Sequence, residues 1–80
     1  MKEYIATFHT HLSALITSRA LTGLGVQARM MPVPRKLSSS CGTCVRYLAE
    51  EPYLSAMDED VEAVYEKIGK EEYTLLMNAD

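Results

Sequence analysis

The chain of 80 residues lacks the features that would assign it to a membrane or a secreted class. No apolar run approaches the roughly 20 residues that a transmembrane helix needs. The first residues also lack the apolar stretch and the small-residue cleavage site of a signal peptide. Eighty residues suffice for one domain and not for two, so we expect a single domain over residues 1–80. By elimination, the sequence predicts a cytoplasmic protein with no membrane partner.

The motifs of the common enzyme classes are absent as well. The sequence contains no phosphate-binding glycine motif, no G-x-S-x-G, no H-E-x-x-H and no dinucleotide-binding fingerprint. No aromatic-rich binding motif accompanies the basic residues, so nucleic-acid binding is not expected. The leading interpretation therefore includes neither a cofactor nor a metal.

Acidic residues are missing from residues 4–49, which carry five Arg and Lys residues, whereas residues 50–80 carry ten acids and two lysines. The net charge of −3 thus hides two halves of opposite sign. Either this is an ordinary solvated surface, or a positive field surrounds Cys41 and Cys44, which both lie in the basic half. Such a field would favour thiolate over thiol.

The two cysteines form the motif Cys41-Gly42-Thr43-Cys44. In a reducing compartment, this spacing indicates redox, carrier or metal chemistry more readily than a structural disulfide. The preceding loop is rich in Pro and Ser, which predicts an accessible Cys41 as the attacking or loaded sulfur. Cys44 would then be the resolving thiol. The alternative is a pair of small apolar side chains without a chemical role.

Alternation and helical spacing predict the element order β-α-β-β-α-β. Strands are expected at residues 3–8, 26–31, 43–49 and 73–77, although residues 41–50 could instead form a short helix. One helix follows the N-cap Thr10, with an apolar stripe at Leu12, Leu15, Ile16, Ala20 and Leu24. A second helix begins at Ser55 or Asp58 and ends near Gly69, with Val61, Val64, Tyr65 and Ile68 buried and Glu62 and Glu66 exposed. The prediction is an α+β, ferredoxin-like fold in which a four-stranded antiparallel sheet carries both helices on one face.

This topology brings distant residues together. The third strand lies between the first two, so the end of the first strand lies beside the start of the third. We therefore expect residues 8–11, the start of the first helix and the loop 32–40 to meet residues 41–44. His9 or His11 could then act as a base on Cys41. The alternatives are two exposed histidines without a role, or a zinc site formed by both histidines and both cysteines.

The loop before Cys41 offers a possible anion site. The guanidinium of Arg35, the hydroxyls of Ser39 and Ser40 and the backbone at Gly42 could grip an oxyanion next to the thiol. Arg46 would add positive charge. The alternative is a solvated serine loop that the prolines merely stiffen.

The run Pro32-Val33-Pro34-Arg35, followed by Ser38-Ser39-Ser40-Cys41-Gly42, resembles the small bacterial domain family named for its likeness to selenium or sulfur carriers. The resemblance covers most of the chain. It implies that Cys41 carries sulfur or selenium as a persulfide or selenyl sulfide, with support from Pro34, Arg35 and Gly42.

A carrier of this kind, sulfurtransferase-like rather than a classical enzyme, would work between donor and acceptor proteins. In the family the position of Cys44 often holds another residue, so a dithiol–disulfide redox module stays open as an alternative. A non-catalytic interaction domain that uses its acidic helix is a third. A small sheet with an exposed edge also makes a homodimer plausible.

Overall fold

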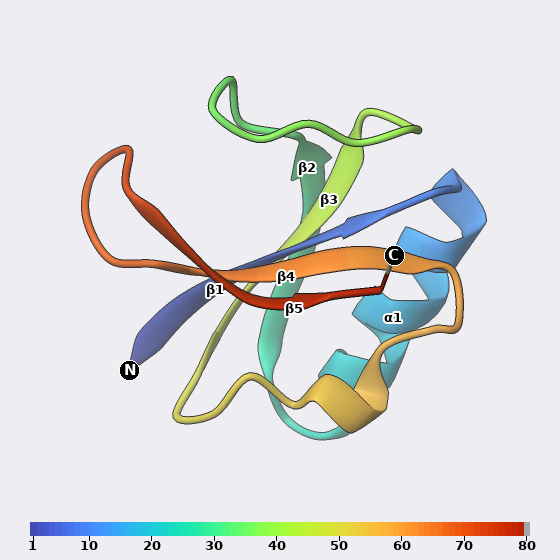
Figure 1. Ribbon diagram of the computed structural model, residues 1–80. Helices are drawn as coiled ribbons and strands as arrows, with labels where there is room; N and C mark the ends of the chain where they lie inside the picture. Colours follow the sequence, from blue (N-terminus) through green and yellow to red (C-terminus); the bar gives the residue numbers. More distant parts are fainter. Residues whose placement is uncertain (80) are drawn as a thin grey trace.

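The computed structural model describes residues 1–79 and shows five strands and one α-helix (Figure 1). The strands are β1 (Lys2–Phe8), β2 (Gln27–Pro32), β3 (Thr43–Ala49), β4 (Val61–Lys67) and β5 (Tyr73–Asn78). The helix α1 spans His11–Gly23, and a single 3₁₀ turn spans Leu54–Ala56. Among the helices of the described residues, none combines the length and the apolar character that crossing a membrane requires.

The strands form one antiparallel sheet in the order β2-β3-β1-β4-β5. The central strand β1 pairs with β3 on one side and with β4 on the other. Its residues from Tyr4 to Phe8 are all buried, which is expected where both faces of a strand are covered. The predicted placement of the third strand between the first two is confirmed, and residues 43–49 form a strand and not a helix.

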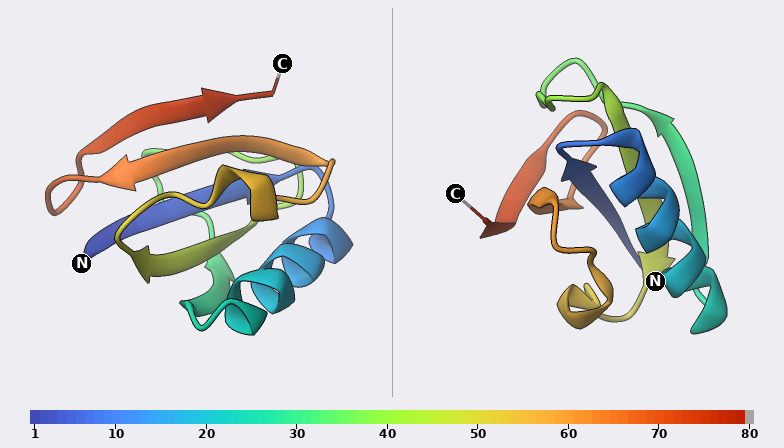
Figure 2. Two further views of the ribbon diagram at one scale, coloured as in Figure 1. Left: turned by 90° about the horizontal axis from the view of Figure 1, so that it is seen from below. Right: turned by 90° about the vertical axis from the view of Figure 1, so that its right-hand side faces the viewer.

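The main hydrophobic core lies between the sheet and α1, which contacts β2, β3 and β1 (Figure 2). Alternate residues of β1 and β3 face this core, among them Tyr4, Phe8, Val45 and Tyr47. The rings of Tyr4 and Tyr47 stack with their centroids 5.2 Å apart. Residues of the connection between β3 and β4, including Met57, pack on the same cluster.

The prediction of a second helix from Ser55 or Asp58 to near Gly69 is wrong, because the strand β4 (Val61–Lys67) occupies most of this segment. The fold is α+β, but its five strands and one helix are not the ferredoxin-like arrangement of four strands and two helices. Residues 58–60 form a turn instead of a helix cap, with the Val61 amide donating to the Asp58 carbonyl at 3.1 Å. Val61 and Val64 are buried as expected, whereas Ile68 is 59% exposed. Glu62, which was expected to be exposed, accepts a hydrogen bond from the Ser39 hydroxyl.

The first helix is confirmed, and its N-cap Thr10 accepts a hydrogen bond from the Ser13 amide at 3.0 Å. Its buried face is nevertheless not the predicted apolar stripe. Leu12 and Ile16 are exposed, while Ser13 and Thr17 are buried together with Ala14 and Leu21. Asp58 provides hydrogen-bond partners for the two buried hydroxyls: it accepts from the Ser13 hydroxyl at 2.7 Å and donates its amide to the Thr17 hydroxyl at 2.9 Å.

Candidate thiol site

Cys41 lies near the end of a ten-residue hairpin loop, residues 33–42, that joins β2 to β3. The loop closes where the Val33 amide donates to the Gly42 carbonyl at 3.1 Å, and it turns where the Leu37 amide donates to the Pro34 carbonyl at 3.0 Å. Gly42 has a φ of 74°, in the left-handed region that other residues avoid. Pro34 and Gly42 therefore shape the segment that presents the thiol.

The loop is fastened to the end of β1 and to β4. The Ser39 hydroxyl lies 2.8 Å from the Phe8 carbonyl oxygen and 2.9 Å from Glu62 Oε1, and its single proton can serve one of them at a time. Ser40 donates its amide to Glu62 Oε1 at 3.0 Å and its hydroxyl to Glu62 Oε2 at 2.9 Å. One carboxylate thus holds both serines that precede Cys41.

Glu62 reaches the loop because β4 is irregular at this point. Phe8 pairs with Val61 and Thr7 pairs with Ala63, so Glu62 is an extra residue between the two pairs. Burial by itself raises the pKa of Glu62. The hydrogen bonds from the Ser40 amide, the Ser40 hydroxyl and the Ser39 hydroxyl, together with nearby His9, outweigh burial and leave that pKa below its ordinary value.

The two histidines contact Ser40 and Thr43, which lie on either side of Cys41 in the sequence, so residues 8–11 meet this segment as the topology predicted. His9 Nδ1 lies 3.4 Å from the Ser40 hydroxyl and 3.5 Å from Glu62 Oε2. His11 Nδ1 lies 3.4 Å from the Thr43 hydroxyl. Within residues 1–79, neither imidazole forms a hydrogen bond with Cys41, so a histidine base on Cys41 stays a prediction.

Cys41 is partly exposed and rests against the core between the sheet and α1. Its sulfur lies 3.9 Å from the Ser39 hydroxyl and donates weakly to the Thr43 carbonyl at 3.5 Å. Cys41 is therefore less buried than Cys44, and a neighbouring hydroxyl and carbonyl limit the orientation of its sulfur.

Cys44 differs sharply from Cys41. It is fully buried between β1 and β2, opposite Thr7 and Met31, and its thiol points to the Pro32 carbonyl at 3.7 Å. Burial, with a smaller effect of Cys41, raises the pKa of Cys44 to about 11. Both cysteines are free thiols. The motif thus joins an accessible thiol to one that the sheet keeps protonated and shielded.

The count over residues 4–49 predicts a purely basic environment for the loop. The structure differs, because an acid from the second half of the sequence also lies there. Glu62 comes from the acidic half of the sequence and lies against Ser39 and Ser40. Arg46 is engaged elsewhere, with its Nε 2.6 Å from Glu3 Oε2. Arg35 is exposed on the loop, where it stays available for the predicted anion site.

Sequence reasoning missed Glu62, the residue that organises the site. On the predicted helix it would lie on an exposed face, and only the pairing of β4 with β1 places it beside the loop. Within residues 1–79, no group of three or more His, Cys, Asp or Glu side chains is arranged to hold a metal ion. The alternative of a zinc site at both histidines and both cysteines therefore lacks its ligand cluster.

The fold and the site define a small α+β domain that presents one accessible cysteine on a fastened hairpin loop. A family model described as "Putative Se/S carrier protein-like" matches residues 3–73, and the chain belongs to this family. The description supports a carrier role in general terms, and a carrier implies partner proteins.

The chain is also similar to the uncharacterized protein YtiA of Escherichia coli (strain K12), with 36% identity over 45 residues. The aligned segment covers 56% of this chain and 53% of that protein, so the chain spans about half the length of the relative. No solved structure matches the chain.

Proposed function

We propose that the protein carries a sulfane sulfur or a selenium atom on Cys41, as a persulfide or selenyl sulfide. The contrast between the two thiols carries the proposal, because Cys41 is partly exposed on its loop and Cys44 is fully buried. Membership of a family named for selenium or sulfur carriage supports the same reading.

Loading is a transfer of one atom between sulfurs. The Cys41 thiolate attacks the outer sulfur of a donor persulfide, R–S–SH, and the donor leaves as the thiolate R–S⁻. The product is Cys41–S–SH, so no oxidant or reductant is consumed. Selenium follows the same course from R–S–SeH. Unloading reverses the roles, since a nucleophile of the acceptor takes the outer atom and Cys41 leaves as the thiolate.

The burial of Cys44 matters for the lifetime of this cargo. A resolving thiolate would attack the inner sulfur of Cys41–S–SH, form a disulfide and expel HS⁻. A thiol with its pKa raised to about 11 is almost entirely protonated at neutral pH, and this one is also shielded by the sheet. Cys41 is therefore expected to hold its cargo until an acceptor arrives. In the dithiol alternative, Cys44 would first have to leave its place in β3.

Mass spectrometry of protein incubated with glutathione persulfide and purified without reductant tests the proposal. We expect one added sulfur atom on the peptide that contains Cys41, in the wild type and in Cys44→Ser, and none in Cys41→Ser. A loss of two hydrogens from the peptide that contains both cysteines would instead favour the dithiol alternative. Protein that accepts no sulfur and forms no disulfide would favour a non-catalytic interaction domain.

A further inference from the structure

β2 is an edge strand of the sheet. In the order β2-β3-β1-β4-β5 it pairs with β3 alone, and no other strand within residues 1–79 lies along its second side. The outward N–H and C=O groups of such a strand are able to pair with an additional strand. Pairing with β3 extends from Gln27 to Pro32, so the free edge is six residues long.

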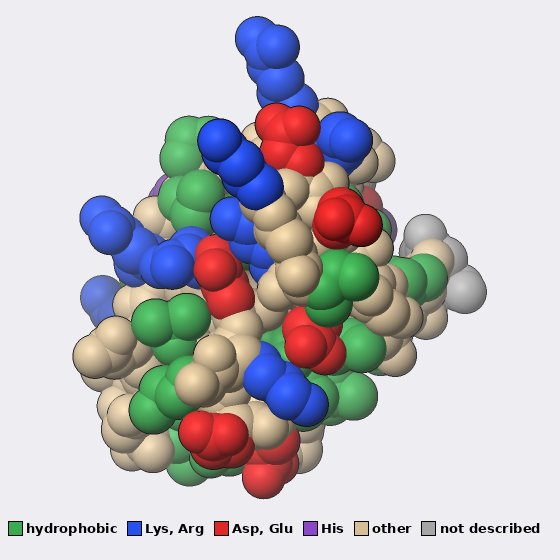
Figure 3. Space-filling model, turned by 90° about the vertical axis from the view of Figure 1, so that its left-hand side faces the viewer, with side chains coloured by type: hydrophobic (Ala, Val, Ile, Leu, Met, Phe, Trp, Pro, Cys, Tyr) green, Lys and Arg blue, Asp and Glu red, His purple; other side chains and the backbone are tan. Residues whose placement is uncertain are grey.

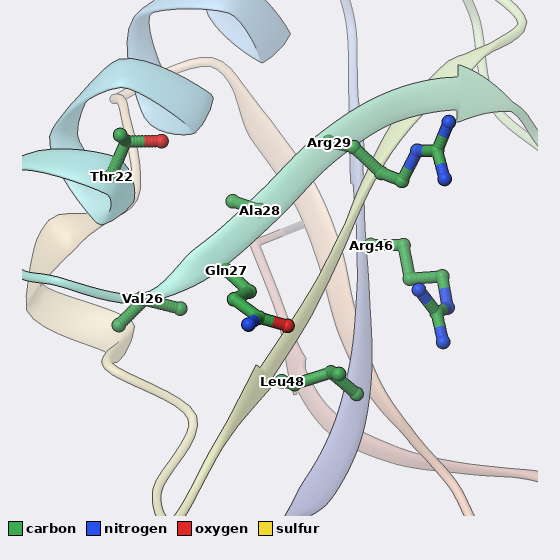
Figure 4. Close-up of a pocket in the computed structure, with 7 residues that line it drawn as sticks. All are labelled: Thr22, Val26, Gln27, Ala28, Arg29, Arg46 and Leu48. Atoms are coloured by element: carbon green, nitrogen blue, oxygen red, sulfur yellow. The ribbon is translucent and has the colours of Figure 1, made fainter.

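A groove of about 440 Å³ lies against β2 and the neighbouring part of β3 (Figure 4). Val26, Ala28 and Leu48 supply its apolar lining, and the side chains of Arg29 and Arg46 lie together toward one end. The groove therefore combines an unpaired backbone, an apolar wall and two guanidinium groups.

The charge at this end is not balanced by the protein itself. Arg29 and Arg46 are directly opposite each other in the register of β2 and β3, an arrangement in which like charges repel. Glu3 accepts from Arg46 through Nε only, one of five donors of the guanidinium, and the same Glu3 oxygen lies 3.9 Å from Lys67 Nζ. Arg29 is exposed and forms no ion pair within the described residues. Figure 3 shows Lys and Arg side chains on this side of the molecule, with acidic side chains among them.

We propose that the free edge of β2 binds an extended acidic segment of a partner protein, which adds to the sheet as a sixth strand. Main-chain hydrogen bonds to β2 would supply general affinity, and a Glu or Asp carboxylate against Arg29, with help from Arg46, would supply specificity. A second copy of this chain fits less well, because neither of its edge strands, Gln27–Pro32 and Tyr73–Asn78, contains an acid. The surface lies outside the Cys41 loop, and binding there needs no thiol.

The test uses the ¹⁵N-labelled protein and an array of capped hexapeptides. Each peptide has Glu at its third position and Val, Ile, Thr or Leu elsewhere, and each has a partner peptide with Gln in place of Glu. We expect Glu peptides to shift the amide resonances of residues 27–31 and to slow the hydrogen exchange of edge amides. Arg29→Gln should weaken their binding at least about tenfold, as loss of a charge-assisted hydrogen bond does. Arg19→Gln, an exposed change on α1, and Cys41→Ser should leave binding unaltered.

Several results would overturn the proposal. The proposal is wrong if no peptide of the array perturbs the resonances of β2 at millimolar concentration. It is also wrong if the Gln peptides bind as tightly as the Glu peptides, or if the shifted resonances belong to β5. If free glutamate reproduces the shifts of the peptides, the groove is a small-anion site and strand addition is wrong. Because Cys41→Ser is included, failure of this proposal and failure of the carrier proposal are seen separately.

Discussion

Replacing Glu62 with Gln tests whether one carboxylate holds in place the loop that carries Cys41, residues 33–42 (the thiol loop). The substitution keeps the shape of the side chain and removes the charge that accepts from the Ser40 amide and from two serine hydroxyls. Hydrogen bonds to a charged group contribute about 1.5–3 kcal/mol each when well shielded. Here the Glu62 side chain keeps 18% of its surface exposed and the released hydroxyls can bind water. We therefore expect a total loss of about 1–3 kcal/mol in the free energy of unfolding.

The pH dependence of this effect has a definite sign. The folded protein holds the pKa of Glu62 below its ordinary value of about 4.3, so the folded state binds the proton less readily than the unfolded state. The stabilisation is complete above that value and is lost as the pH falls below it, through the folded pKa. The difference in unfolding free energy between wild type and Glu62→Gln should accordingly be largest at neutral pH and shrink in acid.

Urea denaturation of both proteins at neutral pH and at several acidic pH values measures this difference. Glu66→Gln is the matched control, since Glu66 lies on the same strand and its side chain forms no hydrogen bond or ion pair within residues 1–79. Release of the loop and removal of a nearby negative charge should also make Cys41 react faster with iodoacetamide. If Glu62→Gln unfolds like the Glu66 control, or if its deficit is unchanged in acid, the carboxylate does not fasten the loop.

Three further predictions concern the thiols and the core. Iodoacetamide should label Cys41 in the folded protein and Cys44 only after unfolding, and equal native labelling in peptide mass spectra would contradict the contrast in burial. Arg35→Ala should slow the labelling of Cys41 at a fixed pH, because it removes one of the two cations of the loop turn, Arg35 and Lys36, that could stabilise the developing thiolate; an unchanged rate would remove Arg35 from the site. Val64→Ala should cost about 1–3 kcal/mol, as loss of fully buried methyl groups in a small core does, and an unchanged melting temperature would indicate loose packing there.

The sequence predicted the half of the fold in which local signals and topology agree. Thr10 is a good N-cap residue and lies two residues after the end of β1, and it caps α1 as expected. Thr43–Ala49 alternates between two faces and forms β3. The right-handed connection from β1 through α1 to β2 then leaves the place between them for β3. The encounter of residues 8–11 with the thiol loop follows from these local features alone.

The second half failed because its pattern fits two structures. Val61, Val64 and Tyr65 are spaced like the apolar face of a helix, yet the β-branched and aromatic residues also suit a strand that contains a bulge. The extra residue of that bulge, Glu62, shifts the alternation by one position and hides the strand period from inspection. An error about one element thus concealed the residue that fastens the site, because Glu62 acts through long-range pairing that no local pattern reports.

The three-dimensional arrangement of charge also differs from its arrangement along the chain, and this difference bears on the choice of partner. Two acids lie against residues of the basic segment 4–49: Glu3 pairs with Arg46, and Glu62 accepts hydrogen bonds from the serines before Cys41. Each already serves a structural contact, so neither neutralises Arg29 on β2 or Arg35 on the loop that follows β2. Arg29, Arg35 and the neighbouring Lys36 therefore lie along one continuous segment, from the free edge of the sheet to the loop that carries Cys41. If Cys41 carries its cargo as proposed, we expect its donors and acceptors to have acidic surfaces around their own reactive groups, because a partner that approaches along this segment meets positive charge before it meets Cys41.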